Sequence, residues 1–200
     1  LLHDIGMLTI PEEILNSRSL TPQQLKTIRN HPLESKRIVE QYGEGFSWIG
    51  DVIVQVHEKH NGSGYPNGLV EDQIHEFARI IGLADTYEAM THPRGDRKAH
   101  VTYNALSEIV DLRNKDYDPR LIKALVHIVS IFPLGSLVKL NNGSIGRVIR
   151  TNKLHSARPL IEILIDTHGN RLDTSEFLNL EEEPMIYIVD PGIDESVLKE

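Results

Sequence analysis

Five side chains that can bind a transition metal are spread along the first 85 residues of the sequence. They are the neighbours His3 and Asp4, followed by His31, His57 and Asp85. Imidazole and carboxylate groups suit Fe, Mn, Ni and Zn, and a carboxylate such as Asp4 can bridge two ions. The chain has no cysteine, which excludes thiolate ligands and thiol nucleophiles. If these residues converge, the sequence predicts a site for one or two divalent metal ions.

Each of these side chains, taken alone, also has an ordinary structural interpretation. Asp85 falls in the apolar stripe of a predicted helix, where pairing with Arg79 or Arg94 would offset the cost of burying its charge. The His-Asp pair near the start suits a helix end, and His57 suits a satisfied core histidine. Convergence on one point is therefore the property that separates a metal site from these alternatives.

The elements that must position the five side chains are predicted to be helices, through about residue 132. Thr21, Pro22 and Gln24 form a capping-box pattern, so a helix runs from there toward His31. An apolar stripe ends beside His57, with aliphatic residues at positions 49, 52, 53 and 56. Further helices are predicted over 32–43, over 47–60, over 76–90, from Thr102 as N-cap, and from Asp118 as N-cap with Pro119 in the first turn.

From residue 133 the apolar period changes to two, which is typical of strands. Residues 137–140 and 145–149 flank Asn142-Gly143, a strong hairpin-turn signal. Short strands are also predicted within 159–165, 176–180 and 185–189. The predicted fold is thus a mainly α helical bundle over 1–132, followed by a small β domain over 133–200. For that β domain, a packing or dimerisation role without chemistry is the simplest interpretation.

Composition restricts the classes of partner. The formal net charge of -8 argues against binding a DNA or RNA polymer, although a local basic patch can still hold a small anion. No apolar run approaches the ~20 residues that span a bilayer, and no signal peptide is visible, so we expect a cytoplasmic chain without membrane contact. The start, "LLHDIG", has no initiator Met and indicates that the chain begins inside a larger unit.

Several motifs in the helical region occur together and in order. They are "HDIG", "IPEEIL", "LTPQQ" leading to "NHPLES", "HEKHNGSGYPNGL", "ARIIGLADTYEAMT" and the basic run from Arg94 to Lys98. In sequence and spacing this set resembles the HD-GYP family, helical metal-dependent phosphodiesterases that act on cyclic di-GMP. The resemblance spans nearly all of residues 1–132. The "SLVKLNNGSIGRV" segment that follows resembles SH3-like barrels, so a barrel or a sheet is expected there.

The resemblance implies roles for individual residues. His3, Asp4, His31, His57 and Asp85 would be metal ligands, with Asp4 bridging and serving as the catalytic carboxylate. Arg94, Arg97 and Tyr65 would face the substrate, which metal-activated water would cleave at a phosphodiester bond. The signature loop, with Gly62, Gly64, Tyr65 and Pro66, would border the site and contact GGDEF (diguanylate cyclase) domains; its alternative interpretation is a plain rigid turn.

Four departures from the family pattern bear on activity. Met7 replaces the Lys of the usual HDIGK, which would approach a substrate phosphate. The usual His-His-Glu becomes Val56-His57-Glu58, so one histidine ligand is missing, and His60 is the nearest replacement. Asn61 stands where Asp is common, and "RGDR", Arg94 to Arg97, replaces the usual Arg-Pro-Tyr run. Loss of a metal-binding imidazole weakens metal binding. Even the loss of a residue that only hydrogen-bonds to a ligand lowers metal affinity by about 10- to 100-fold.

Two functions from different classes follow from these observations. The retained His3, Asp4, His31, His57 and Asp85 favour a cyclic di-GMP phosphodiesterase. Val56 and Met7 favour a degenerate domain that senses the nucleotide or docks on GGDEF domains without hydrolysis. A homodimer is compatible with both functions.

Overall fold

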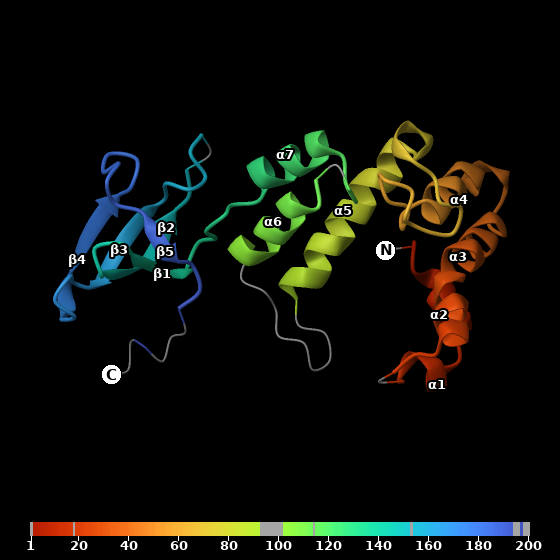
Figure 1. The fold of residues 1–200 in the computed structure, drawn as a ribbon, viewed down its shortest axis with the longest axis horizontal. Helices are drawn as coiled ribbons and strands as arrows, with labels where there is room; N and C mark the ends of the chain where they lie inside the picture. The colour runs from red at the N-terminus through yellow and green to blue at the C-terminus, as the bar shows by residue number, and fades with distance from the viewer. Residues whose placement is uncertain are drawn as a thin grey trace. The chain divides into compact units, whose positions relative to one another are not determined.

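The computed structural model describes residues 2–17, 19–92, 102–113, 115–152, 154–193 and 197 (Figure 1). Helices come first and a five-stranded antiparallel sheet follows, which confirms the predicted fold class. The chain divides into two compact units, Leu1–Thr86 with Leu112–Ile122 and Tyr87–Asp111 with Lys123–Glu200. Each unit is considered by itself below. The predicted boundary between residues 132 and 133 stays a prediction.

The helical elements follow the chain in this order: η1 (Ile5–Thr9), α1 (Glu12–Leu15), α2 (Pro22–Arg29), α3 (His31–Glu40), η2 (Glu44–Phe46), α4 (Ser47–Val54), η3 (Glu71–Gln73), α5 (Glu76–Thr91), α6 (Thr102–Asp111) and α7 (Pro119–Ile128). The predicted capping box is present, because the Thr21 hydroxyl accepts the backbone N–H of Gln24 and the Gln24 side chain accepts that of Thr21. Asp118 likewise accepts the N–H of Arg120 at the start of α7. Thr102, predicted as a cap, is instead the first helical residue of α6.

The first unit is centred on α3, which packs against both η1 and α4 (Figure 1). Its buried apolar side chains include Val52 and Ile53 of α4 and Ala78 of α5. The predicted helix over 47–60 was too long, since α4 ends at Val54. After Val54 the backbone hydrogen bonds join residues three apart, as in a 3-10 helix. The His57 carbonyl then accepts the N–H of Tyr65 from the following loop, so the helix does not continue.

The second unit contains the sheet, with strands in the order β4-β3-β2-β1-β5. The strands are β1 (Leu137–Leu140), β2 (Ile145–Arg150), β3 (Leu160–Ile165), β4 (Arg171–Asn179) and β5 (Ile188–Asp190). β1 and β2 pair across the predicted Asn142-Gly143 turn, where Gly143 has φ +93° and the Asn142 side chain accepts the Ser144 N–H. β4 begins five residues before its predicted start, and β5 begins three residues late.

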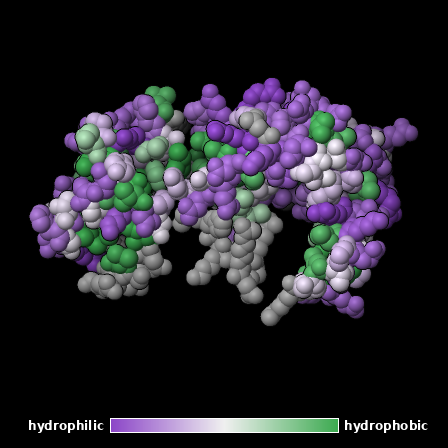
Figure 2. Space-filling model, in the orientation of Figure 1, coloured by the Kyte–Doolittle hydropathy of each residue, from purple (hydrophilic) through white to green (hydrophobic). Residues whose placement is uncertain are grey.

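One face of the sheet carries a compact apolar core. Its buried members are Phe132, Val138, Leu140, Val148, Ile161, Ile163 and Leu180. Figure 2 shows further hydrophobic side chains gathered on the surface of the sheet, within a mostly hydrophilic face of the molecule. Phe177, Met185, Tyr187 and Val189 are all more than half exposed. A packing or dimerisation role for this unit is compatible with that surface and stays a prediction.

None of the described helices is long and apolar enough to cross a bilayer. The predicted cytoplasmic location is not tested by this finding.

Candidate metal centre

The turn that carries His3 and Asp4 is fixed against α3 by a buried serine. Ser35 has no exposed surface; its hydroxyl donates to the His3 carbonyl (2.7 Å) and accepts the N–H of Gly6 (2.8 Å). A Cβ on Gly6 would lie 2.2 Å from the His31 carbonyl oxygen, so only glycine permits this close approach. The His-Asp pair is therefore held rigidly beside the first turn of α3.

His31 is the first residue of α3, and its ring is oriented by a backbone carbonyl. Nδ1 donates to the carbonyl of Ile28 at 2.8 Å, which leaves Nε2 of the neutral ring with a free lone pair. His57, in the turn after α4, brings its own Nε2 to 3.1 Å from that atom. Two imidazole nitrogens from different elements thus point to one place, as ligands of a shared metal do.

Asp85 belongs to α5, which packs closely against the backbone of Val56, the residue before His57. A Cβ on Gly82 would lie 2.3 Å from the carbonyl oxygen of Val56, so this glycine lets the helix approach. One turn later, Asp85 Oδ1 lies 3.8 Å from His3 Nε2. The alternative pairing of Asp85 with Arg79 is not seen, because Arg79 contacts Asp72 and Asp118 instead. Arg94, the other alternative, is outside the described residues.

Asp4 lies at the centre of the group. Its carboxylate oxygens are 3.0 Å from His3 Nε2, 3.3 Å from His31 Nε2 and 3.9 Å from His57 Nε2. These imidazoles hold the pKa of Asp4 far below its usual range, and His3 also lowers the pKa of Asp85. In turn, Asp4 and Asp85 raise the pKa of His3 to about 9. Both carboxylates are anionic at neutral pH, whereas His3 would have to release its proton to bind a metal.

The donor atoms have the chemistry and the spacing of a site for a divalent cation. His3 Nε2 is buried and forms no well-aligned hydrogen bond, despite its closeness to Asp4. Ligand atoms of His3, Asp4 and His57 all lie within 4.8 Å of one another. Nitrogen and oxygen donors without sulfur suit Fe, Mn, Ni and Zn. The structure thus brings together all five residues predicted as ligands, while their role as ligands remains a proposal.

The signature loop lies against this cluster through Tyr65. The Tyr65 ring stacks on His57, with centroids 5.0 Å apart and planes at 14°, and meets the edge of His31 at 6.4 Å. Burial raises the pKa of Tyr65 to about 12, so its phenol stays protonated at neutral pH. Tyr65 therefore lies against the cluster, and its predicted contact with substrate stays a prediction.

Glu58 anchors the signature loop, a role that the sequence reasoning missed. Its buried carboxylate accepts backbone N–H groups from Asn67 (2.7 Å), Gly68 (3.2 Å) and Leu69 (3.0 Å). A Cβ on Gly64 would lie 2.4 Å from the Cα of Glu58, so the loop also packs directly on this residue. The available signal was a carboxylate followed by a Gly- and Asn-rich segment, whose N–H groups need acceptors.

The other sequence-predicted loop residues have local roles. Gly62 has φ +78°, and a Cβ there would meet Val70 at 2.6 Å; Pro66 follows Tyr65 through a cis peptide bond. Asn61 accepts the N–H and hydroxyl of Ser63, which shapes the start of the loop. These contacts support the rigid-turn interpretation. Contact with a GGDEF domain stays a prediction.

The residues that depart from the family pattern do not supply replacement ligands. Val56 is only 2% exposed and lines an apolar hollow together with His3. Within the described part of the chain, His60 has no ring contact or ion pair with the cluster and instead lines a cavity of about 10 Å³ together with Arg79 and Asp118. Met7 is half-buried within η1. Arg94 and Arg97, predicted to bind substrate, lie outside the described residues.

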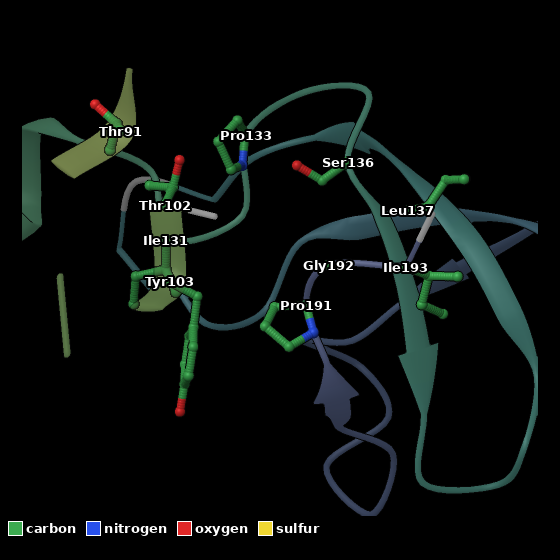
Figure 3. A pocket seen from close by; sticks show the side chains of 10 residues that line it. All are labelled: Thr91, Thr102, Tyr103, Ile131, Pro133, Ser136, Leu137, Pro191, Gly192 and Ile193. Carbon is green, nitrogen blue, oxygen red and sulfur yellow. The ribbon is translucent and has the colours of Figure 1, made fainter. Parts of the chain in front are cut away.

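A second hollow, in the sheet-containing unit, lacks groups for this chemistry. It has a volume of about 420 Å³ and is lined by Thr91, Thr102, Tyr103, Ile131, Pro133, Ser136, Leu137, Pro191, Gly192 and Ile193 (Figure 3). Hydroxyl groups are its polar side chains, and no described lining residue is an imidazole, a carboxylate or a cation. The His-Asp cluster is therefore the candidate site.

Comparison with known proteins agrees with this geometry. The family model "HD domain" matches residues 1–121, and the model "KOW domain associated with HD domain" matches residues 137–199. A cyclic di-GMP phosphodiesterase of Pseudomonas aeruginosa is 32% identical over 170 residues, which are 84% of this chain and 41% of that protein. One of Borreliella burgdorferi is 29% identical over 185 residues, 92% of this chain and 48% of that protein.

A third relative is the cyclic di-GMP phosphodiesterase response regulator of Xanthomonas campestris pv. campestris. It is 32% identical over 127 residues, covering 62% of this chain and 34% of the relative. The chain thus spans less than half the length of each of these three proteins. Over half of the chain matches the HD domain model, and its motifs are those of the HD-GYP type. The chain belongs to the HD domain family, as a member of its HD-GYP group.

Proposed function

We propose that this chain is a metal-dependent phosphodiesterase that hydrolyses cyclic di-GMP. The observation that carries the proposal is the convergence of three imidazoles and two carboxylates, with His3 Nε2 buried and without a well-aligned hydrogen bond. The names of the three relatives support this substrate. His3, Asp4, His31, His57 and Asp85 would hold one divalent ion, or two with Asp4 between them.

A bound divalent ion would supply Lewis-acid stabilisation of the phosphoryl oxygens and an activated water. The chain's own residues would balance the charge of the ion, orient its ligands and shield the cluster from water. Ionised Asp4 and Asp85 balance the charge of the ion, and the Ile28 carbonyl keeps the His31 ring in its ligand tautomer. Tyr65, protonated at neutral pH, shields the cluster from bulk water and can donate to a phosphate oxygen. Hydrolysis would join the water oxygen to phosphorus and break the P–O3′ bond, and the proton that the water loses would balance the proton that the leaving O3′ gains.

Metal content and turnover test this proposal directly. We expect the purified chain, supplied with Mn²⁺ or Fe²⁺, to convert cyclic di-GMP to the linear dinucleotide and to bind about one metal equivalent or more. Asp4→Asn and His31→Gln should each lower metal content and activity by at least tenfold. His168→Gln is the matched control, because His168 lies on the exposed surface of the sheet unit. Intact cyclic di-GMP with a metal-loaded chain would refute the proposal.

The alternative of a degenerate sensor or docking module gains no support from the relatives, which are named as enzymes. The same experiment separates it from the enzyme. Calorimetric binding of cyclic di-GMP without hydrolysis would establish the sensor, and absence of binding would exclude both. Cyclic GMP-AMP, assayed in parallel, would report how strictly the second guanine is recognised.

A further inference from the structure

An arginine that the sequence motifs do not single out lies beside the cluster. Arg29 is the last residue of α2 and precedes His31 by two positions. It is exposed, and its guanidinium carbon lies 5.5 Å from the centroid of the Tyr65 ring. That ring stacks in turn on His57. The contact with Tyr65 therefore places the guanidinium at the edge of the His-Asp cluster.

Arg29 has no carboxylate partner among the described residues. By contrast, other basic side chains of the same unit are paired, as Lys36 is with Asp51 and Arg37 with Glu34. An exposed guanidinium that contacts an aromatic face keeps its five N–H donors available. Next to a cluster whose expected substrate is an anion, such a free cation is positioned to meet a phosphate.

A second cation lies one helical turn earlier on the same helix. Lys26 precedes Arg29 by three residues, so the two share a face of α2. Lys26 also forms no ion pair within the described part of the chain. It lines a hollow of about 550 Å³, which extends to His31 and is otherwise formed by Thr9, Ile10, Gln23, Thr27, Asn30 and Glu34. Amide and hydroxyl groups dominate this lining, and Glu34 is already paired with Arg37.

We propose that the face of α2 that carries Arg29 and Lys26 binds the two phosphates of one cyclic dinucleotide. Arg29 contacts the phosphodiester at the metal cluster, and Lys26 contacts the other phosphate, with the attached nucleotide in the hollow. This inference rests on the proposed function. It also accounts for Met7: the cation that the family pattern places in η1 is supplied here by α2.

Binding measurements on charge-removing variants test this assignment. Arg29→Gln should weaken cyclic di-GMP binding and raise KM by about tenfold or more, because a charge-assisted contact to phosphate is lost. Arg29→Lys should recover part of the loss, since Lys keeps the charge without the fork of donors. Lys26→Gln should give a smaller loss for cyclic di-GMP. Metal content should be unchanged in all three variants, which distinguishes lost phosphate contacts from damage to the cluster.

Lys36→Gln is the matched control. Lys36 lies on α3 and is paired with Asp51, and neither residue lines the hollow, so its loss changes the net charge equally without removing a free cation. We expect its KM to stay within twofold of the native chain. If Arg29→Gln also stays within twofold, the inference is overturned. Equal weakening by Lys36→Gln would likewise overturn it, because a general charge effect would then explain the result.

A separate probe keeps this inference distinct from the proposed function. If the native chain neither hydrolyses nor binds cyclic di-GMP, the proposed function fails. The same variants are then titrated with bis(p-nitrophenyl) phosphate, a simple phosphodiester, in the metal-loaded chain. Weaker binding by Arg29→Gln than by Lys36→Gln would still uphold a phosphate site on α2. Equal binding, or none by the native chain, would overturn it.

Discussion

At the scale of single residues, Val56 decides how complete the metal site is. It is 2% exposed and lines an apolar hollow beside His3. Val56→His should lower the stability of the metal-free chain by about 1–3 kcal/mol, because an unpartnered imidazole is buried. Added Mn²⁺ should restore much of that loss and raise metal content, since a ligand that binds the folded state stabilises it.

Thermal unfolding with and without Mn²⁺, together with metal analysis, measures both effects. Val56→Asn is the control, because it buries a polar group of similar size that is a poor ligand for transition metals. Equal metal content in the Val56→His variant and the native chain would contradict the view that a missing imidazole limits the site.

Glu58 is the residue on which the position of the signature loop depends. Both of its carboxylate oxygens accept backbone N–H groups of the loop that carries Tyr65. Glu58→Gln replaces one oxygen by an NH₂ group that opposes a backbone N–H, so a loss of about 1–3 kcal/mol in unfolding free energy is expected. Hydrogen exchange at Asn67 and Leu69 should accelerate. Glu71→Gln, an exposed change just after the loop, should leave both quantities unaltered.

At the scale of elements, α7 begins at a buried carboxylate whose charge matters for stability. Asp118 is 5% exposed, accepts the Arg120 guanidinium at 2.7 Å and lies 3.6 Å from Arg79. Arg120 chiefly lowers the pKa of Asp118, so the folded state favours its ionised form. The resulting stabilisation is present above the unfolded pKa, about 3.9, and is lost as pH falls through the lower folded pKa.

Urea unfolding of Asp118→Asn at several pH values tests this linkage. At pH 7 the variant should be less stable than the native chain by about 1–3 kcal/mol, and the difference should shrink below pH 4. Asp51→Asn removes an exposed pair with Lys36 and should cost only about 0–1 kcal/mol at any pH. A difference for Asp118→Asn that persists at pH 2 would show that packing, not charge, is the cause.

The elements also show where reasoning from sequence succeeds and where it stops. Local signals were reliable: the Thr21 capping box, the Asn142-Gly143 turn and the change of period near residue 133 all correspond to elements of the structure. The end of α4 at Val54 was missed because it depends on a contact from the loop, Tyr65 N–H to the His57 carbonyl. The apolar stripe in the sequence continues through Val56, so it does not indicate that the helix ends at Val54.

The same limit applies to the site. Residue types and order were enough to name His3, Asp4, His31, His57 and Asp85, which the structure brings together. Side chains that act through non-local contacts were not recognised: the Ser35 hydroxyl bonds the His-Asp turn from 32 positions away, and Arg29 of α2 contacts Tyr65 of the signature loop. Nothing in a linear pattern records such pairings, because they arise from the packing of separate elements.

At the scale of the whole molecule, each of the two compact units has its own buried apolar side chains, and Phe132 indicates where the core of the sheet begins. Phe132 is 4% exposed within the core of the sheet, with Ile131 packed against that core. Both residues precede the boundary predicted after residue 132, and the matched KOW segment begins later still, at residue 137. We propose that the sheet domain extends back to include them, since a core residue belongs with the side chains it contacts.

Phe132→Ala in the whole chain tests this boundary. The sheet unit should lose about 3–5 kcal/mol, the usual cost of truncating a buried Phe, and amides of β2 and β3 should exchange faster. Amides of α3 and the metal content should not change, because the cluster belongs to the other unit. Leu134→Ala, at a 66% exposed position two residues on, should alter neither. Faster exchange in α3 as well would mean that both cores unfold as one cooperative body, and no boundary near residue 132 would then have energetic meaning.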